Sequence, residues 1–138
     1  MVKPNTMTIG WMQIGISQGK PVINVMVRES RYTKEFIDKS GEFTVNIPLD
    51  ESYKEALSFC GVKSGRDFDK FKECNIKTFA SDKVAPPSIA NCLNYECKVL
   101  YKTVMTKELT AKELSEHFYK TNDYHTIYTG EILSIKEN

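Results

Sequence analysis

The segment VINVMVRESRYT, residues 22–33, contains the clearest structural pattern in the chain. Residues 22–27 are apolar apart from one asparagine, which predicts a strand buried on both faces. A helix is expected to follow over residues 30–40, because Ser30 or Thr33 can cap its first turn. The segment therefore predicts a buried strand that leads the chain directly to the start of a helix.

The other elements follow from the alternation of apolar and polar residues and from helix signals. Strands are predicted over residues 7–16, 43–47, 93–101 and 125–135, and helices over residues 50–59, 67–73 and 110–119, the last opened by a capping box at residues 110–113. The alternation of the last strand slips near Gly130, where a β-bulge is expected. About five strands with separate helices predict an α+β fold that is mainly β, with an antiparallel sheet that curls towards a barrel.

Composition limits the classes of partner. With 138 residues, 41% of them hydrophobic and 27% charged, the chain fits one soluble domain over residues 1–138. Its 19 Lys and Arg nearly balance its 18 Asp and Glu, so no strong field would gather a nucleic acid or an anionic membrane. No apolar stretch approaches the roughly 20 residues that cross a bilayer, and residues 1–5 lack the apolar core of a signal peptide. We therefore expect a cytoplasmic protein.

The four cysteines, Cys60, Cys74, Cys92 and Cys97, form neither a metal-binding nor a disulfide pattern. Zinc sites usually contain closer pairs such as C-x-x-C, and disulfide scaffolds are typical of smaller secreted chains. We expect reduced thiols that are buried or half-buried. Only Cys60, beside a glycine and a basic loop, merits a functional interpretation.

Two segments have the composition of anion sites. Arg28–Thr33 places arginines and hydroxyls at a helix start, where free N–H groups and the helix dipole attract anions and arginine can hold a phosphate with two hydrogen bonds. Lys63–Asp67 places Gly65 between a hydroxyl and two cations, which can form a backbone nest. A capped surface helix with solvated arginines and an ordinary basic turn explain the same spacings. The two segments together favour a phosphorylated ligand, although neither matches a Walker loop or a G-x-G-x-x-G motif.

Two further positions can serve a flat ligand. Residues 5–11, NTMTIGW, combine small and hydroxyl side chains that let a ring system approach the backbone, although a barrel strand that bends at Gly10 fits as well. His125 opens the last strand beside an acid and an aromatic residue, where it can be a proton donor or a structural histidine. His117 is assigned no role, and the sequence predicts no serine–histidine–acid triad and no metal cluster.

Motifs along nearly the whole chain resemble one family. They are NTMTIGW (5–11), GKP (19–21), RESRYTKEFI (28–37), FTVN (43–46), CGVKSGRD (60–67) and DYHTIYTGEI (123–132). In this order they resemble the flavin reductase-like, FMN-binding split-barrel family, and more closely its flavoredoxin branch. The resemblance implies an antiparallel split β-barrel with flanking short helices.

The resemblance also implies a cofactor and its site. FMN would be held without a covalent bond, usually at the interface of a homodimer, with NADH or NADPH as hydride source or a redox protein as electron partner. The implied site places the isoalloxazine ring along Thr6, Met7 and Thr8, and the ribityl phosphate among Arg28, Ser30, Arg31 and Thr33, with Lys63 and Ser64 nearby. His125 would border the reactive face of the ring, near a nicotinamide.

The chain departs from the family pattern at its start. Family members usually have an additional N-terminal stretch with a barrel strand before the motif at residues 5–11, and here only four residues precede that motif. We expect a neighbouring subunit to close that edge, or the barrel to be incomplete. The sequence leaves three functions open: an NAD(P)H-dependent flavin reductase, a non-enzymatic FMN electron carrier, and a degenerate barrel without flavin that acts as a binding module.

Overall fold

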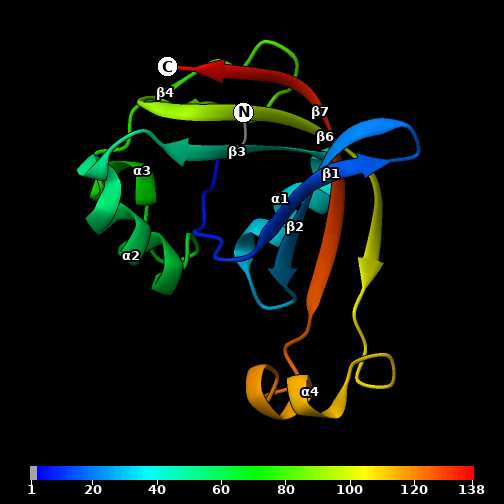
Figure 1. Ribbon diagram of the computed structural model, residues 1–138. Helices are drawn as coiled ribbons and strands as arrows, with labels where there is room; N and C mark the ends of the chain where they lie inside the picture. The colour runs from blue at the N-terminus through cyan, green and yellow to red at the C-terminus, as the bar shows by residue number, and fades with distance from the viewer. Residues whose placement is uncertain (1–2) are drawn as a thin grey trace.

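The computed structural model describes residues 3–138 (Figure 1); Met1 and Val2, the start of the segment inspected for a signal peptide, lie outside the described residues. The elements in chain order are β1 (Met12–Ser17), β2 (Lys20–Arg28), α1 (Tyr32–Ser40), β3 (Glu42–Pro48), the 3₁₀ turn η1 (Glu51–Tyr53), α2 (Lys54–Val62), α3 (Lys70–Glu73), β4 (Thr78–Phe79), β5 (Ser88–Ile89), β6 (Cys92–Val104), α4 (Lys112–Phe118) and β7 (His125–Glu137). Within this described range, no helix has the length and apolar character needed to cross a membrane.

Five strands form one sheet in the order β1-β2-β7-β6-β3, and every neighbouring pair is antiparallel. Strands β6 and β7 are the longest, and α4 lies in the connection between the end of β6 and the start of β7, at one end of the sheet (Figure 1). The sheet curls but does not close into a complete barrel, because its two edge strands, β1 and β3, do not pair with each other. This architecture confirms the predicted α+β class, mainly β, with an antiparallel split barrel and short flanking helices.

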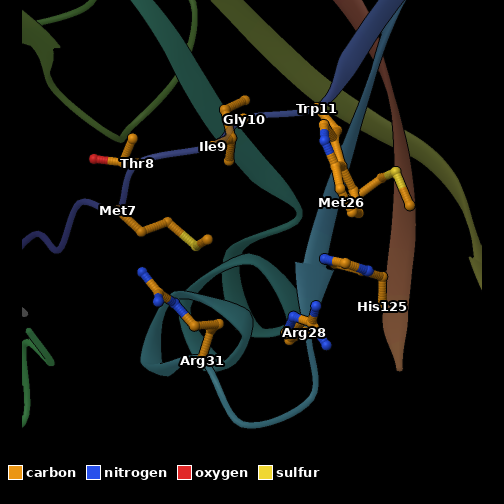
Figure 2. A pocket seen from close by; sticks show the side chains of 9 residues that line it. All are labelled: Met7, Thr8, Ile9, Gly10, Trp11, Met26, Arg28, Arg31 and His125. Atoms are coloured by element: carbon orange, nitrogen blue, oxygen red, sulfur yellow. The ribbon is translucent and has the colours of Figure 1, made fainter. Parts of the chain in front are cut away.

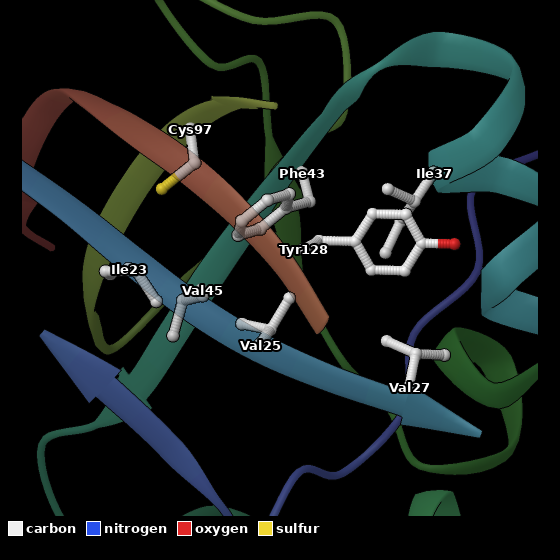
Figure 3. Packing of buried hydrophobic residues seen from close by; sticks show 8 residues of the cluster. All are labelled: Ile23, Val25, Val27, Ile37, Phe43, Val45, Cys97 and Tyr128. Atoms are coloured by element: carbon white, nitrogen blue, oxygen red, sulfur yellow. The ribbon is translucent and has the colours of Figure 1, made fainter. Parts of the chain in front are cut away.

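The core lies inside the curled sheet (Figure 3). Alternate residues of β2 supply Ile23, Val25 and Val27, and the rest of the cluster comprises Ile37 of α1, Phe43 and Val45 of β3, Cys97 of β6 and Tyr128 of β7. On the outer face of β2, Val22 is buried, whereas Asn24 and Met26 are half-buried, so the prediction of a strand buried on both faces holds only in part for that face. That half-buried face is where Met26 turns towards the site described below.

The β-bulge expected near Gly130 is confirmed, but the extra residue lies on the neighbouring strand β6 and not on β7. Val99 pairs with Gly130 and Tyr101 pairs with Thr129, so Leu100 is the unpaired residue. A Cβ at position 130 would lie 2.5 Å from the Phe43 ring. Glycine is therefore required where β7 passes the Phe43 ring.

Several local predictions were wrong. Residues 7–11 are extended but unpaired, and regular strand begins only at Met12. The first turn of α1 is capped by neither Ser30 nor Thr33, because Ser30 donates to Asp123 and Thr33 accepts from Asn5. The capping box at residues 110–113 also fails, since the Thr110 hydroxyl donates to the carbonyl of Thr106 in the preceding turn.

The cysteines lie as predicted. Cys60, Cys92 and Cys97 are buried, Cys74 is half-buried, and all four are free thiols. Burial raises the pKa of Cys60 to about 11, which keeps its thiol protonated at neutral pH and removes the reason to treat it as a nucleophile. Among residues 3–138, no three His, Cys, Asp or Glu side chains gather as a metal site.

Candidate flavin site

A pocket of about 210 Å³ opens where the extended N-terminal segment crosses the ends of β2 and β7 (Figure 2). Its walls are Met7, Thr8, Ile9, Gly10, Trp11, Met26, Arg28, Arg31 and His125. Residues 7–11 run along one side of the pocket, and the start of α1 and the strand ends form the opposite side (Figure 2). The segment from residue 7 to residue 11 is therefore a wall of the pocket and not a strand of the sheet.

Side chains from distant parts of the chain hold this segment in place. Asn5 Nδ2 donates to the Thr33 hydroxyl at 2.9 Å, and the Thr8 hydroxyl donates to the carbonyl of Leu57 at 2.6 Å. Gly65 packs against Asn5 so closely that a Cβ at position 65 would overlap the Asn5 amide. The segment thus depends on α1, α2 and the loop after α2 for its position.

Two arginines provide the positive charge of the pocket. Arg31, the N-cap residue of α1, donates to the carbonyl oxygens of Gly61 at 2.9 Å and Cys60 at 3.2 Å. Arg28 donates to the carbonyl oxygens of Asp123 at 2.8 Å and Phe118 at 3.0 Å. Carbonyl partners orient both guanidinium groups without neutralising them, because no carboxylate within the described residues forms a salt bridge with either.

Lys70 adds a third cation behind this wall. Its side chain is 3% exposed, and its ammonium donates to the carbonyl oxygens of Thr6 at 2.8 Å and Cys60 at 3.2 Å. Burial lowers the pKa of Lys70, the Cys60 thiol opposes that effect, and the neighbouring Arg31 adds to it. A buried ammonium held only by carbonyl groups keeps a strong positive potential next to the pocket.

The other residues predicted to hold the cofactor do not line this pocket. The carbonyl of Thr6 is bound by Lys70. Ser30 donates its hydroxyl to Asp123, and its backbone N–H donates to the same carboxylate at 3.0 Å. Lys63 lies 5.8 Å from the centre of the Phe68 ring, and the Ser64 hydroxyl accepts from the backbone N–H of Arg66 at 3.1 Å. The pocket walls thus include five predicted residues, Met7, Thr8, Arg28, Arg31 and His125, and leave out Thr6, Ser30, Thr33, Lys63 and Ser64.

His125 begins β7 opposite Arg28 and is 8% exposed. Its ring lies 5.6 Å from the Trp11 ring, and its Nδ1 lies 2.7 Å from the Tyr119 hydroxyl. Burial lowers the pKa of His125, the Arg28 charge lowers it further, and Asp123 partly opposes both effects. The imidazole at the pocket wall is therefore neutral at neutral pH.

Sequence reasoning missed several residues that form or support the site. The position of Met26 could have been predicted from the alternation along β2, since its side chain points to the face opposite to that of Val25 and Val27. Lys70 gave no signal, because lysine is rarely buried and its partners are backbone carbonyls far along the chain. Tyr119 was predicted only as the end of a helix, and its contact with His125 depends on the return of the chain from α4 to β7.

An open, curled antiparallel sheet with a cationic pocket at its strand ends defines a split-barrel protein with a candidate site for a flat anionic ligand. The chain belongs to the family described as flavin reductase like domain, whose model matches residues 2–138. No curated protein sequence is significantly similar to the chain.

Solved structures agree with the family assignment. A flavoredoxin of Desulfovibrio vulgaris is 26% identical with a TM-score of 0.76, over 97% of this chain and 62% of its own. A flavoredoxin from Methanosarcina acetivorans is 27% identical with a TM-score of 0.72, over 97% of this chain and 61% of its own. An NADH:FAD oxidoreductase of Streptomyces globisporus shares the fold. It is 15% identical with a TM-score of 0.64, over 98% of this chain and 66% of its own. The chain spans less than two thirds of the length of either flavoredoxin.

Proposed function

We propose that the protein binds FMN in this pocket and works as an NAD(P)H-dependent flavin reductase. The observation that carries the proposal is that Arg28, Arg31 and the unpaired segment 7–11 border one cavity. A ring system can lie against the extended backbone while a phosphate meets the arginines and the first N–H groups of α1. FMN combines a flat ring with a phosphate on a flexible chain. The ring matches the side of the pocket formed by residues 7–11, and the phosphate matches the side formed by the arginines.

The proposed contacts divide by chemistry. The isoalloxazine ring would lie along Thr6, Met7 and Thr8, where Met7 points into the pocket and the Thr8 side chain turns away from it (Figure 2). The phosphate would meet Arg31 and Arg28 first, and Ser30, Thr33, Lys63 and Ser64 would border it. Ser30 would exchange its bond with Asp123 for a bond with the phosphate. The buried ammonium of Lys70 strengthens the attraction without contact.

A reductase also needs a place for the nicotinamide. Bound FMN would supply the redox chemistry by accepting a hydride from NADH or NADPH. His125 and Trp11 form the wall away from Arg31, and Trp11 is 45% exposed, so an aromatic ring can enter there. His125 can then hold a polar group of the nicotinamide or donate a proton.

The second candidate function is an FMN electron carrier that is not an enzyme. The similarity to two flavoredoxins, at 26% and 27% identity, favours this candidate. Such a carrier would exchange electrons with a redox protein partner in place of a nicotinamide. Steady-state oxidation of NADH or NADPH separates the two functions, because a carrier would need a separate reductase to turn over.

We also propose that a second copy of the chain completes the site. The pocket volume of about 210 Å³ is below the roughly 300–1,000 Å³ of typical small-molecule sites. A homodimer with the flavin at its interface would supply the remaining wall, next to the exposed side chains of Trp11 and Phe118. Sedimentation of the protein with and without FMN tests this part of the proposal.

Titration of the purified protein with FMN and with riboflavin tests the proposed function. Flavin fluorescence reports binding of both ligands, and only FMN carries the phosphate. Tight binding of FMN with much weaker binding of riboflavin is the expected result. A protein that binds neither flavin would support the degenerate barrel and overturn the proposal.

A further inference from the structure

We propose that Tyr119 is a positioning residue that holds the His125 ring with its Nε2–H directed at the pocket, where it donates a hydrogen bond to an acceptor atom of the bound ligand. The inference begins with the contact of 2.7 Å between the Tyr119 hydroxyl and Nδ1 of His125. With Nδ1 occupied by Tyr119, Nε2 is the nitrogen left for the pocket. The His125 ring projects from β7 into the space between Trp11 and Arg28 (Figure 2).

Tyr119 is itself held firmly. It is 5% exposed, and its ring stacks on the Tyr124 ring at 4.4 Å with an interplanar angle of 15°. The Arg28 guanidinium lies over the Tyr119 ring, 5.1 Å from its centre, and donates to carbonyl groups on both sides of it, at Phe118 and Asp123. The phenol therefore cannot rotate away from His125 without losing its stacking on Tyr124 and its contact with the Arg28 guanidinium.

The direction of the hydrogen bond follows from the surrounding groups. Arg28 from β2 and Asp123 from the loop before β7 are the charges that face His125, and they oppose each other. Burial outweighs their difference, so the imidazole is neutral, and burial also raises the pKa of Tyr119, so the phenol keeps its proton. Among residues 3–138, the one other acceptor within reach of this proton is the Met105 sulfur at 3.6 Å, which is a much weaker acceptor than an imidazole nitrogen. The proton therefore points to Nδ1, and Nε2 carries the ring proton.

A donor fixed in this way has a defined chemical use. A neutral imidazole with Nε2–H favours a carbonyl oxygen or an unprotonated ring nitrogen and does not attract an anion. The pocket then has two ends: the Arg31 end attracts charge, and the His125 end selects a neutral acceptor such as a flavin or nicotinamide carbonyl. The identity of this acceptor rests on the proposed function, whereas the orientation of His125 in the free protein does not.

Nitrogen NMR of protein labelled with ¹⁵N-histidine tests the inference directly. The chain contains only two histidines, so the spectrum has one exposed reference, His117, beside His125. At neutral pH we expect His125 to show a proton on Nε2 and an unprotonated Nδ1 that accepts a hydrogen bond. A proton on Nδ1, or a doubly protonated ring, would overturn the inference without any variant.

Two variants separate positioning from packing. Tyr119→Phe removes the hydroxyl that contacts His125 and should shift the Nδ1 resonance towards that of a nitrogen without a hydrogen bond. Tyr124→Phe removes the hydroxyl of the stacked neighbour, which donates to Ser115 at 2.8 Å, and should leave the His125 resonances in place. Equal shifts in both variants would mean that Tyr119 acts only through packing.

Addition of FMN to the labelled wild-type protein tests the ligand. We expect the Nε2 resonance of His125 to shift while the resonances of His117 remain. If FMN binds and Nε2 does not respond, the ligand part of the inference is wrong. If FMN does not bind at all, the proposed function fails, and the orientation of His125 is judged from the free protein.

Discussion

Arg31 and Lys70 donate hydrogen bonds to the same atom, the carbonyl oxygen of Cys60, each at 3.2 Å. Two cations that share one neutral acceptor repel each other, and neither has a salt bridge among residues 3–138. Arg31 reaches the pocket, and Lys70 lies behind it. We expect this repulsion to cost stability in the free protein and to be relieved by an anion bound next to Arg31, as the proposed function requires.

Replacement of Arg31 by alanine should weaken FMN binding by about 1.5–3 kcal/mol, the scale of a hydrogen bond to a charged group. Riboflavin binding should change much less, because riboflavin has no phosphate. Flavin titration measures both values, and Lys39→Ala, which removes one exposed charge at the other end of α1, is the matched control. Equal losses for the two flavins would show that Arg31 supports the fold of the pocket and does not bind the phosphate.

Replacement of Lys70 by methionine should weaken FMN binding several-fold and riboflavin binding less, because the ammonium acts on the phosphate through its field. Lys70→Arg keeps the charge and serves as the control. Thermal unfolding of both variants should be recorded alongside, since methionine leaves the carbonyl of Thr6 without its donor. An unchanged ratio of FMN to riboflavin affinity in Lys70→Met would limit Lys70 to a structural role.

Gly65→Ala should weaken flavin binding, because the added methyl group displaces Asn5 and with it the segment that lines the pocket. We also expect a loss of about 1–3 kcal/mol in the free energy of unfolding, as is typical of overpacking. Gly15→Ala is the matched control, since a Cβ at position 15 meets no atom within 4 Å. Denaturant unfolding and flavin titration measure the two effects, and identical behaviour of the two variants would contradict the prediction.

Asp38 should make the stability of the protein sensitive to acid. Burial raises the pKa of Asp38, but hydrogen bonds from Lys34, Tyr128 and Lys102 outweigh this effect and lower the pKa from 3.8 to about 2. A pKa below that of the unfolded chain means that Asp38 stabilises the fold fully above pH 3.8 and less and less as the pH falls towards 2.

Asp38→Asn should therefore remove part of the acid sensitivity. After allowance for the solvent exposure of the carboxyl group, we expect the variant to lose about 0.5 kcal/mol less than the wild type between pH 6 and pH 3. Denaturant unfolding at the two values of pH measures the difference. Glu113→Gln, on the exposed surface of α4, should show no such effect. The same acid sensitivity in Asp38→Asn and the wild type would refute the assignment.

The sequence predicted the elements that depend on neighbouring residues. Strands β3, β6 and β7, helix α1 with Gly41 after it, and the bulge at Gly130 all follow from alternation or from glycine geometry. The two capping predictions failed because Ser30 and Thr110 found partners outside the helices that they precede. The local sequence shows which hydrogen bonds a Ser or Thr side chain is able to form, and tertiary contacts determine which of them it forms.

The candidate site was predictable only in part, for the same reason. Arg28, Arg31 and His125 lie at ends of predicted elements, where a sequence pattern can place them. Trp11 was quoted in a motif but assigned no role, and Lys70 and Tyr119 act through contacts with residues distant in the sequence or across a turn. These contacts exist only in the folded chain and leave no pattern in the sequence.

The central claim is that this pocket holds FMN with its phosphate at the start of α1. A crystal structure of the protein soaked with FMN tests that claim most directly. We expect density for the ring along Met7 and Thr8 and for the phosphate within hydrogen-bond distance of Arg31. An empty pocket, or FMN bound elsewhere with its phosphate away from Arg31, would contradict the account.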